Sequence, residues 1–185
     1  MKLKLMIQYN CMEVSEMFKT GDYIHYSTNG LCRVAEVTTL DFDGADKSRL
    51  YYRLIPVDGK RSTIFTPVDN TKVAMRLAMT REEAEALIDS MPGIETLLIP
   101  DEKTREQIYR NALLSQDGRS WVQIIKTLYR RRQIRLAQGR KATSTDEKYL
   151  RSAEELLYSE LALALGMHKE EMEGYIVKRL ETEKV

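Results

Sequence analysis

The stretch GRSWVQIIKTLYRRRQIRLAQGRK, residues 118–141, decides how the second half of the chain folds. Apolar residues recur in it at helical spacing: Trp121, Ile124, Ile125 and Leu128. This pattern predicts one helix over 118–141 with a buried face. The other residues are strongly basic: Arg119, Lys126, Arg130, Arg131, Arg132, Arg135, Arg140 and Lys141.

No Asp or Glu occurs between Asp117 and Asp146, although basic and acidic residues nearly balance over the whole chain. Like charges that are close together on one helix destabilise it unless opposite charges neutralise them. One interpretation is that the helix binds a polyanion, and nucleic-acid phosphate is the commonest polyanion. The other is a solvated helix whose arginines pair with acids of the next helix. The basic run alone favours neither.

Composition narrows the class of protein but says little about partners. The chain has 185 residues, of which 43% are hydrophobic and 31% charged, and its net charge is +1. These values are typical of a globular protein of one domain or two small ones. No apolar run approaches the length of a membrane span. Cys11 and Cys32 show neither metal nor disulfide spacing, so we expect a reducing, cytoplasmic environment.

The first half of the chain predicts a small β-barrel, because short strand-like runs alternate with tight turn signals. Asn29-Gly30 is the strongest of these hairpin signals, since both central residues of such a turn need positive φ. Closure into a barrel would remove the exposed edges of the sheet. The five expected strands cover residues 23–26, 31–40, 50–57, 62–66 and 71–79.

The second half predicts an all-α bundle of about five helices with short connections. Thr80 followed by Glu82 and Glu83 is typical of a capped helix start. Further helices are expected from residues 100, 118, 144 and 168. The fold class is therefore α+β in two domains, residues 17–78 and 79–185. Residues 1–16 are expected to be an extension, either disordered or an extra strand.

No catalytic or metal-binding constellation is present in the sequence. Cys32 lies in a strand and is expected to be a half-buried structural thiol, and His25 a packed or surface histidine. Asp41, Asp43 and Asp46 lack the spacing of a calcium loop. Trp121 lies on the apolar face and is expected in the core. We therefore expect no enzyme activity, no cofactor, no metal and no small-molecule substrate.

Taken together, the order of these segments resembles the CarD/CdnL family of bacterial transcription regulators. Residues 17–26, MFKTGDYIHY, are similar to the family's opening strand, and Tyr51-Tyr52 with Leu54 to its paired aromatics. The edge strand ends at Pro67, as in the family. In the second domain, the segment Leu128-Tyr129-Arg130-Arg131, followed by a polar loop and the helix after Asp146, is similar to the family's motif. The resemblance covers about residues 17–165.

The resemblance implies a Tudor-like (SH3-like) five-stranded barrel that binds the β subunit of RNA polymerase. In the family the barrel's edge strand pairs with a polymerase strand, so backbone hydrogen bonds supply the affinity. The corresponding residues here are Leu54, Phe65, Thr66 and Pro67.

The resemblance also implies that the helical domain contacts upstream promoter DNA. Family members insert a tryptophan into the minor groove there. The matching segment here, residues 100–105, has no aromatic residue, so that wedge is missing or replaced. The implied backbone contacts are Lys103, Arg105, Arg119, Lys126, Arg130, Arg131, Arg132 and Arg135.

The sequence therefore predicts a cytoplasmic, polymerase-bound regulator of transcription initiation that reaches the nucleoid through polymerase. Two alternatives remain open at this point. One is a polymerase-binding module without DNA contact, whose sign would be basic-helix arginines paired with Glu154, Glu155 or Glu160. The other is a free-standing nucleic-acid binder that uses Tyr23, Tyr51 and Tyr52 for stacking. No membrane contact is expected.

Overall fold

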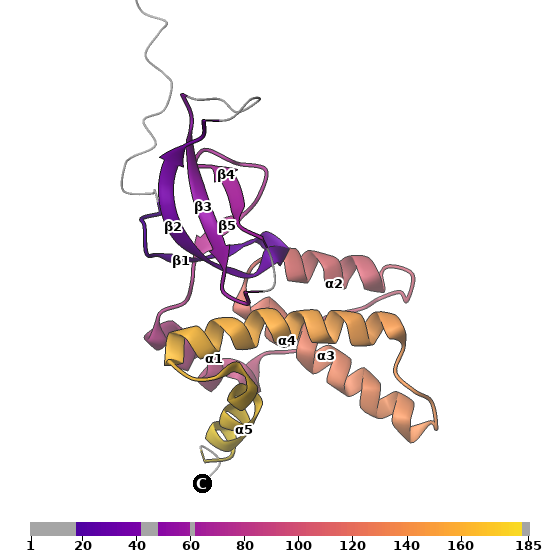
Figure 1. Ribbon diagram of the computed structural model, residues 1–185. Helices are drawn as coiled ribbons and strands as arrows, with labels where there is room; N and C mark the ends of the chain where they lie inside the picture. Colours follow the sequence, from indigo (N-terminus) through magenta and orange to yellow (C-terminus); the bar gives the residue numbers. More distant parts are fainter. Residues whose placement is uncertain (1–17, 42–47, 60–61, 183–185) are drawn as a thin grey trace, which may run out of the picture. The chain divides into compact units, whose positions relative to one another are not determined.

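The computed structural model describes residues 18–41, 48–59 and 62–182, drawn in colour in Figure 1. The predicted extension at residues 1–16 lies outside this part of the chain. The chain forms two compact units. The first contains the chain up to Asp22 and Arg33–Thr71, and the second contains Tyr23–Cys32 and everything from Lys72 onward.

Five strands form one sheet, as predicted. They are β1 (Tyr23–Tyr26), β2 (Leu31–Thr39), β3 (Leu50–Pro56), β4 (Ile64–Pro67) and β5 (Met75–Leu77). The strand order is β4-β3-β2-β1-β5, so β4 and β5 are the two terminal strands of that order. The β3–β4 and β1–β5 pairs are antiparallel. The fifth strand has three residues instead of the nine expected over 71–79.

The turn between β1 and β2 differs from the predicted two-residue hairpin turn at Asn29-Gly30. A short 3₁₀ turn occupies Ser27–Asn29, and the residues with positive φ are Ser27 (48°) and Gly30 (79°). The amide of Tyr26 donates to the carbonyl of Gly30 at 3.0 Å. Gly30 thus provides the required backbone conformation, but within a longer connection.

The core of the first unit follows the alternation of side chains along β3. Tyr52 and Leu54 point to the buried face, where Thr66 of β4 joins them. The amide of Phe18 donates to the hydroxyl of Tyr52 at 3.1 Å, and the two rings lie 5.6 Å apart. Residues at odd positions of β3 therefore face the other side of the sheet.

Five helices follow, as predicted: α1 (Arg81–Ser90), α2 (Arg105–Leu114), α3 (Gly118–Ala137), α4 (Ser144–Leu165) and α5 (Met172–Thr182). Helices α3 and α4 lie side by side in the second unit (Figure 1). Trp121, Ile124 and Leu128 of α3 are buried together with Leu157 and Leu161 of α4. The predicted apolar face of the basic helix and the core position of Trp121 are confirmed.

Local hydrogen bonds explain where α1 begins and why a turn precedes α2. The Thr80 hydroxyl accepts from the amide of Glu83, and the Glu83 carboxylate accepts from the amide of Thr80, which completes a capping box. Helix α2 begins at Arg105 instead of Pro100. The preceding residues form a turn, because Asp101 accepts from the amides of both Lys103 and Thr104.

The basic helix ends at Ala137, four residues before the predicted end. Gly139 has a φ of 68°. Its amide donates to the carbonyl of Leu136, and the next amide, that of Arg140, donates to Arg135 at 2.8 Å. This is the Schellman arrangement, which terminates a helix at a left-handed glycine. Arg140 and Lys141 consequently lie beyond α3.

Candidate interaction surfaces

Strand β4 presents one apolar side chain at the end of the sheet. In the β3–β4 register, Phe65 lies opposite Arg53 and Thr66 opposite Tyr52. The Phe65 side chain is 46% exposed, whereas Thr66 is buried. Pro67 ends the strand and is partly exposed. The fully buried Leu54 can influence a partner only through the position of its backbone.

The helical unit exposes several of the basic side chains singled out by the sequence. Arg119 lies at the first turn of α3, and Arg130 and Arg132 lie in its second half; all three are exposed. Lys103 is exposed in the turn before α2. These four side chains are exposed and can reach an external anion, and the charge of Arg132 also acts on Glu154 of α4.

Two other basic residues of α3 are engaged with backbone carbonyls. The Lys126 ammonium donates to the carbonyls of Met91 at 3.1 Å and Pro92 at 3.2 Å, and also to that of Ile94. It thereby ties α3 to the 3₁₀ turn that follows α1. Arg135 donates from Nε to the carbonyl of Lys141 at 2.8 Å, which supports the end of α3.

Arg105 and Arg131 meet in one cluster of ionised groups. Both contact Glu102, and both also lie within 3.6 Å of the carboxylate of Asp146. The two arginine side chains are largely covered, with 17% and 24% of their surface exposed. The sequence had placed them among exposed phosphate contacts.

Two of the three acids named as a sign of a DNA-free module, Glu155 and Glu160, are paired differently from that expectation, whereas the charge of Arg132 of α3 acts on the third, Glu154, and lowers its pKa against the effect of burial. Glu155 binds Lys169 at 2.8 Å, and Glu160 binds Arg76 of β5. Arg131 of α3 uses Glu102 and Asp146 instead. Part of the positive charge of the basic helix is therefore neutralised by ion pairs. The acids that form them come from the turn before α2 and from the start of α4.

A buried polar cluster lies at the centre of the second unit. Arg76 donates from Nη1 and Nη2 to the Glu160 carboxylate, at 2.5 and 2.8 Å, and the amide of Met79 donates to it at 2.8 Å. Nε2 of His25 lies 3.3 Å from the same carboxylate. The His25 ring packs on Trp121 with centroids 4.9 Å apart. His25 is thus a packed core residue.

Burial and pairing act against each other on Glu160. Burial raises the pKa of Glu160, but hydrogen bonds and charge from Arg76 and His25 outweigh it and lower the pKa to about 2. Sequence reasoning missed this residue as a core group. The available signal was an acid within the apolar stripe of residues 144–165, three residues after Leu157 and directly before Leu161.

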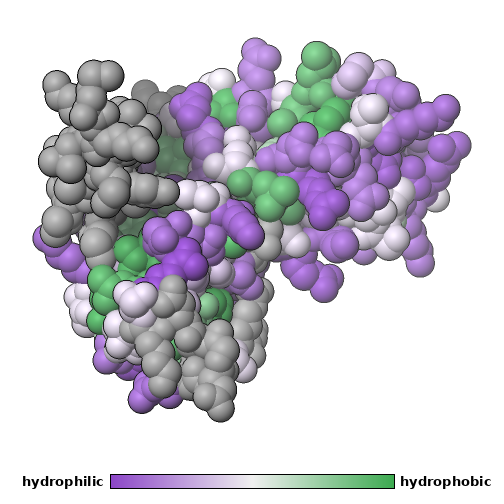
Figure 2. All heavy atoms as spheres, turned by 90° about the horizontal axis from the view of Figure 1, so that it is seen from above, coloured by the Kyte–Doolittle hydropathy of each residue, from purple (hydrophilic) through white to green (hydrophobic). Residues whose placement is uncertain are grey.

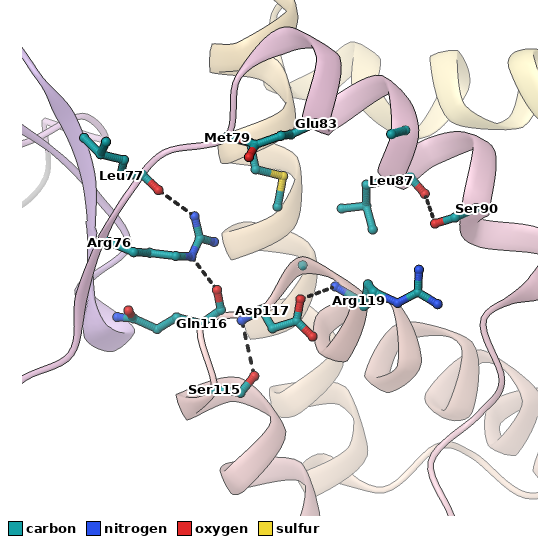
Figure 3. Close-up of a pocket in the computed structure, with 12 residues that line it drawn as sticks. Arg76, Leu77, Met79, Glu83, Leu87, Ser90, Ser115, Gln116, Asp117 and Arg119 are labelled. Atoms are coloured by element: carbon teal, nitrogen blue, oxygen red, sulfur yellow. Dashed lines mark hydrogen bonds between the residues drawn. The ribbon is translucent and has the colours of Figure 1, made fainter.

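An open pocket of about 600 Å³ lies beside this cluster, and Figure 3 shows its lining. Arg76 reaches across to the carbonyl of Gln116, and Asp117 accepts from the amides of Arg119 and Ser120 at the start of α3. Arg76, Gln116 and Asp117 therefore already serve the fold. Its apolar wall consists of Leu77, Met79, Ala86 and Leu87.

The described residues hold no group of three or more His, Cys, Asp or Glu side chains arranged for a metal ion. None of the helices described is long and apolar enough to cross a membrane. Cys32 is fully buried, more so than the half-buried position expected. In Figure 2, hydrophilic residues cover most of the visible face, and hydrophobic residues appear only in separate groups.

The described residues thus form a small five-stranded sheet with β4 as a terminal strand, and five helices of which α3 is strongly basic. Comparison with protein families agrees with this description. Residues 18–79 match the CarD-like/TRCF RID domain, and residues 100–177 match the CarD C-terminal domain. The chain belongs to the CarD-like family, and it is a transcription-related protein that interacts with RNA polymerase. No curated protein matches the sequence.

Proposed function

We propose that the protein regulates transcription initiation by holding the β subunit of RNA polymerase with strand β4 while its helical unit touches upstream promoter DNA. The observation that carries this proposal is the exposed Phe65 on β4. CarD-like proteins are in general regulators without enzymatic activity, and we extend this to the present chain. We expect it in the cytoplasm, at the nucleoid through polymerase.

The geometry of β4 supports strand addition as the mode of polymerase binding. The strand pairs with β3 on one side and is terminal in the strand order. A partner strand that pairs with its other side would gain backbone hydrogen bonds, and Phe65 would supply the side-chain contact. Pro67 has no amide hydrogen and would limit this pairing to the residues before it.

The exposed arginines support a DNA contact that does not read sequence. Arg119, Arg130 and Arg132 belong to a stretch without any acidic residue, so a phosphate backbone along α3 meets no carboxylate of that helix. Contacts of this kind position a protein on DNA without specifying bases. A protein that makes both contacts at once stabilises the polymerase–promoter state that permits them.

The polymerase contact is tested by Phe65→Glu, with Val57→Glu as the matched control. Val57 is 48% exposed in the same unit, so both changes put a charge on an equally exposed apolar residue. We expect Phe65→Glu to weaken binding to purified polymerase at least tenfold, about 1.4 kcal/mol, and Val57→Glu to have little effect. Equal binding by both variants would refute the strand-addition model.

The DNA contact is tested by adding promoter DNA to the polymerase complex across a salt series. We expect DNA to tighten binding, with ~0.9 in the log–log salt slope for each phosphate contacted. A polymerase-binding module without DNA contact is the second candidate, favoured by the internal pairing of Lys126, Arg131 and Arg135. If that candidate is correct, promoter DNA does not tighten the binding to polymerase. The stacking alternative loses support because Tyr52 is buried.

A further inference from the structure

Two arginines from different helices converge on one surface carboxylate. Arg131 of α3 donates from Nη1 to Oε1 of Glu102 at 2.7 Å and from Nη2 to Oε2 at 3.1 Å. Arg105, the first residue of α2, donates from Nη1 to the same Oε2. The Glu102 side chain is 61% exposed. Glu102 thus lies over the outer edges of two guanidinium groups.

A second carboxylate forms ion pairs with the two arginines, without a hydrogen bond to either Nε. Nε of Arg105 lies 3.4 Å from Oδ1 of Asp146, and Nε of Arg131 lies 3.6 Å from Oδ2. The Asp146 side chain is only 6% exposed. Asp146 lies in the first turn of α4, where its amide donates to the capping hydroxyl of Thr143. Asp146 therefore faces the Nε atoms of both guanidinium groups, whereas Nη atoms of both donate to Glu102.

Tyr109 belongs to the buried core of the unit, and the charges of Asp146, Arg131, Arg105 and Glu102 all act on it. Burial, and then the charge of Asp146, raise the pKa of Tyr109 to about 12, so its hydroxyl stays protonated at neutral pH. Tyr109 therefore adds no charge to the cluster. We call Arg105, Arg131 and Asp146 the arginine clamp.

The charges of the clamp match one phosphate group. Two arginines and Asp146 leave one positive charge, which Glu102 neutralises in the free protein. A backbone phosphate also carries one negative charge and presents two oxygens to an arginine fork, as a carboxylate does. The hydrogen bond from Arg131 lowers the pKa of Glu102, which keeps it ionised. An exposed ion pair is weak, so Glu102 can be displaced at small cost, whereas Asp146 cannot.

We propose that the arginine clamp binds one backbone phosphate of nucleic acid and that Glu102 covers the clamp in the free protein as a built-in phosphate mimic. This inference rests on the DNA contact of the proposed function and names one of its sites. Glu102 lowers DNA affinity by competition, so that the clamp engages only where other contacts, including polymerase, already hold the DNA. The clamp is thus a regulated contact, and the exposed Arg130 and Arg132 are permanent ones.

The test measures binding of a dye-labelled short DNA duplex to the full chain by fluorescence anisotropy across a salt series. The variants are Glu102→Gln, Arg131→Lys, the two combined, and Glu95→Gln as the control for a lost surface charge. Glu95 is exposed in the segment that leads to α2. Arg131→Lys keeps the charge opposite Asp146 but removes the two-pronged geometry. Unfolding midpoints of every variant verify that it is folded.

We expect Glu102→Gln to tighten duplex binding several-fold and to steepen the salt slope by ~0.9, the value for one additional phosphate. Glu95→Gln should change affinity much less. In the Arg131→Lys background, Glu102→Gln should lose its advantage, since the two residues then no longer couple. These three results together would establish the clamp.

Equal tightening by Glu102→Gln and Glu95→Gln would show only a general charge effect and would overturn the clamp while leaving the DNA contact intact. Weaker binding by Glu102→Gln would overturn it as well, because Glu102 would then be a supporting residue. Inorganic phosphate as competitor separates the sources of the ligand. If it raises the melting temperature of Glu102→Gln while duplex affinity stays unchanged, the site binds free anions and the proposal fails. If the duplex binds no variant, with or without polymerase, the DNA contact of the proposed function fails too.

Discussion

Arg76 and Glu160 form a two-pronged ion pair in which the carboxylate is fully buried. The pair joins β5 to the middle of α4, and His25 of β1 lies against the same carboxylate. Strands β1 and β5 also pair with each other, with Ile24 opposite Leu77. This connection explains why both strands belong to the same compact unit as the helices.

Glu160→Gln is expected to destabilise the helical unit by about 3–5 kcal/mol, because it leaves Arg76 without its buried partner. The change keeps the size of the side chain, so packing is preserved. Urea unfolding followed by circular dichroism measures the effect. Glu155→Gln is the matched control, since its pair with Lys169 is about half exposed, and it should cost less than about 1 kcal/mol. Similar losses for both variants would contradict the buried role of Glu160.

The stability that ionised Glu160 contributes should depend on pH in one direction. Its pKa is 4.5 in the unfolded reference and about 2 in the fold. A lowered pKa stabilises the fold above the unfolded value, and the gain is lost as pH falls through the folded value. Each pKa unit is worth about 1.4 kcal/mol, so about 3 kcal/mol is at stake, of which about 2 is lost by pH 3.

Comparison of the wild type with Glu160→Gln at pH 6 and near pH 3 isolates this contribution from those of other acids. The difference in free energy of unfolding between the two proteins should shrink as the pH falls. A constant difference over this range would mean that Glu160 is not held ionised by Arg76.

Local sequence patterns predicted which segments form strands and helices in most cases. The features that they did not predict depend on contacts between residues far apart in the sequence. The capping box at Thr80 and Glu83 and the apolar face of α3 depend on residues at most a few turns apart, so the sequence predicted them. Arg76 and Glu160 are 84 residues apart, and no local pattern links them. The end of α3 was predictable in principle, since Gly139 was visible as a helix terminator.

The candidate sites show the same division. The exposure of Phe65 and the burial of Thr66 follow from strand alternation, although the family resemblance groups both residues as polymerase contacts. Lys126 looked like any other exposed cation of a basic helix. Its acceptors are backbone carbonyls 32–35 residues away. Because every residue has a backbone carbonyl, the sequence does not show which of them accept a hydrogen bond. The pairing of Arg131 with acids on two other segments was hidden for the same reason.

Trp121 should behave as a core residue and not as a DNA wedge. It is fully buried, and its indole Nε1 donates to the carbonyl of Leu113 at 3.3 Å. Trp121→Ala should therefore cost about 3–5 kcal/mol of stability. As the only tryptophan of the chain, it reports directly by fluorescence. We expect blue-shifted emission that resists acrylamide quenching and does not change when duplex DNA is added; quenching by DNA would contradict the core assignment.

Lys126 and Arg130 lie four residues apart on α3 and should respond to the same substitution in opposite ways. Lys126→Met removes a charged donor from the carbonyls of Met91, Pro92 and Ile94, and should cost about 1–3 kcal/mol of stability. It should leave the salt dependence of DNA binding nearly unchanged, because the ammonium is already engaged. Urea unfolding and duplex anisotropy across a salt series measure the two effects on the same samples.

Arg130→Met is the counterpart, since Arg130 is exposed on the same helix. Its stability should stay within about 0.5 kcal/mol of the wild type. Its DNA salt slope should fall by ~0.9, because one phosphate contact is lost. The reverse pattern, in which Lys126→Met flattens the salt slope and Arg130→Met destabilises the fold, would show that the engaged cation is the one that DNA uses. Because both variants lose one positive charge, net charge cannot account for a difference between them.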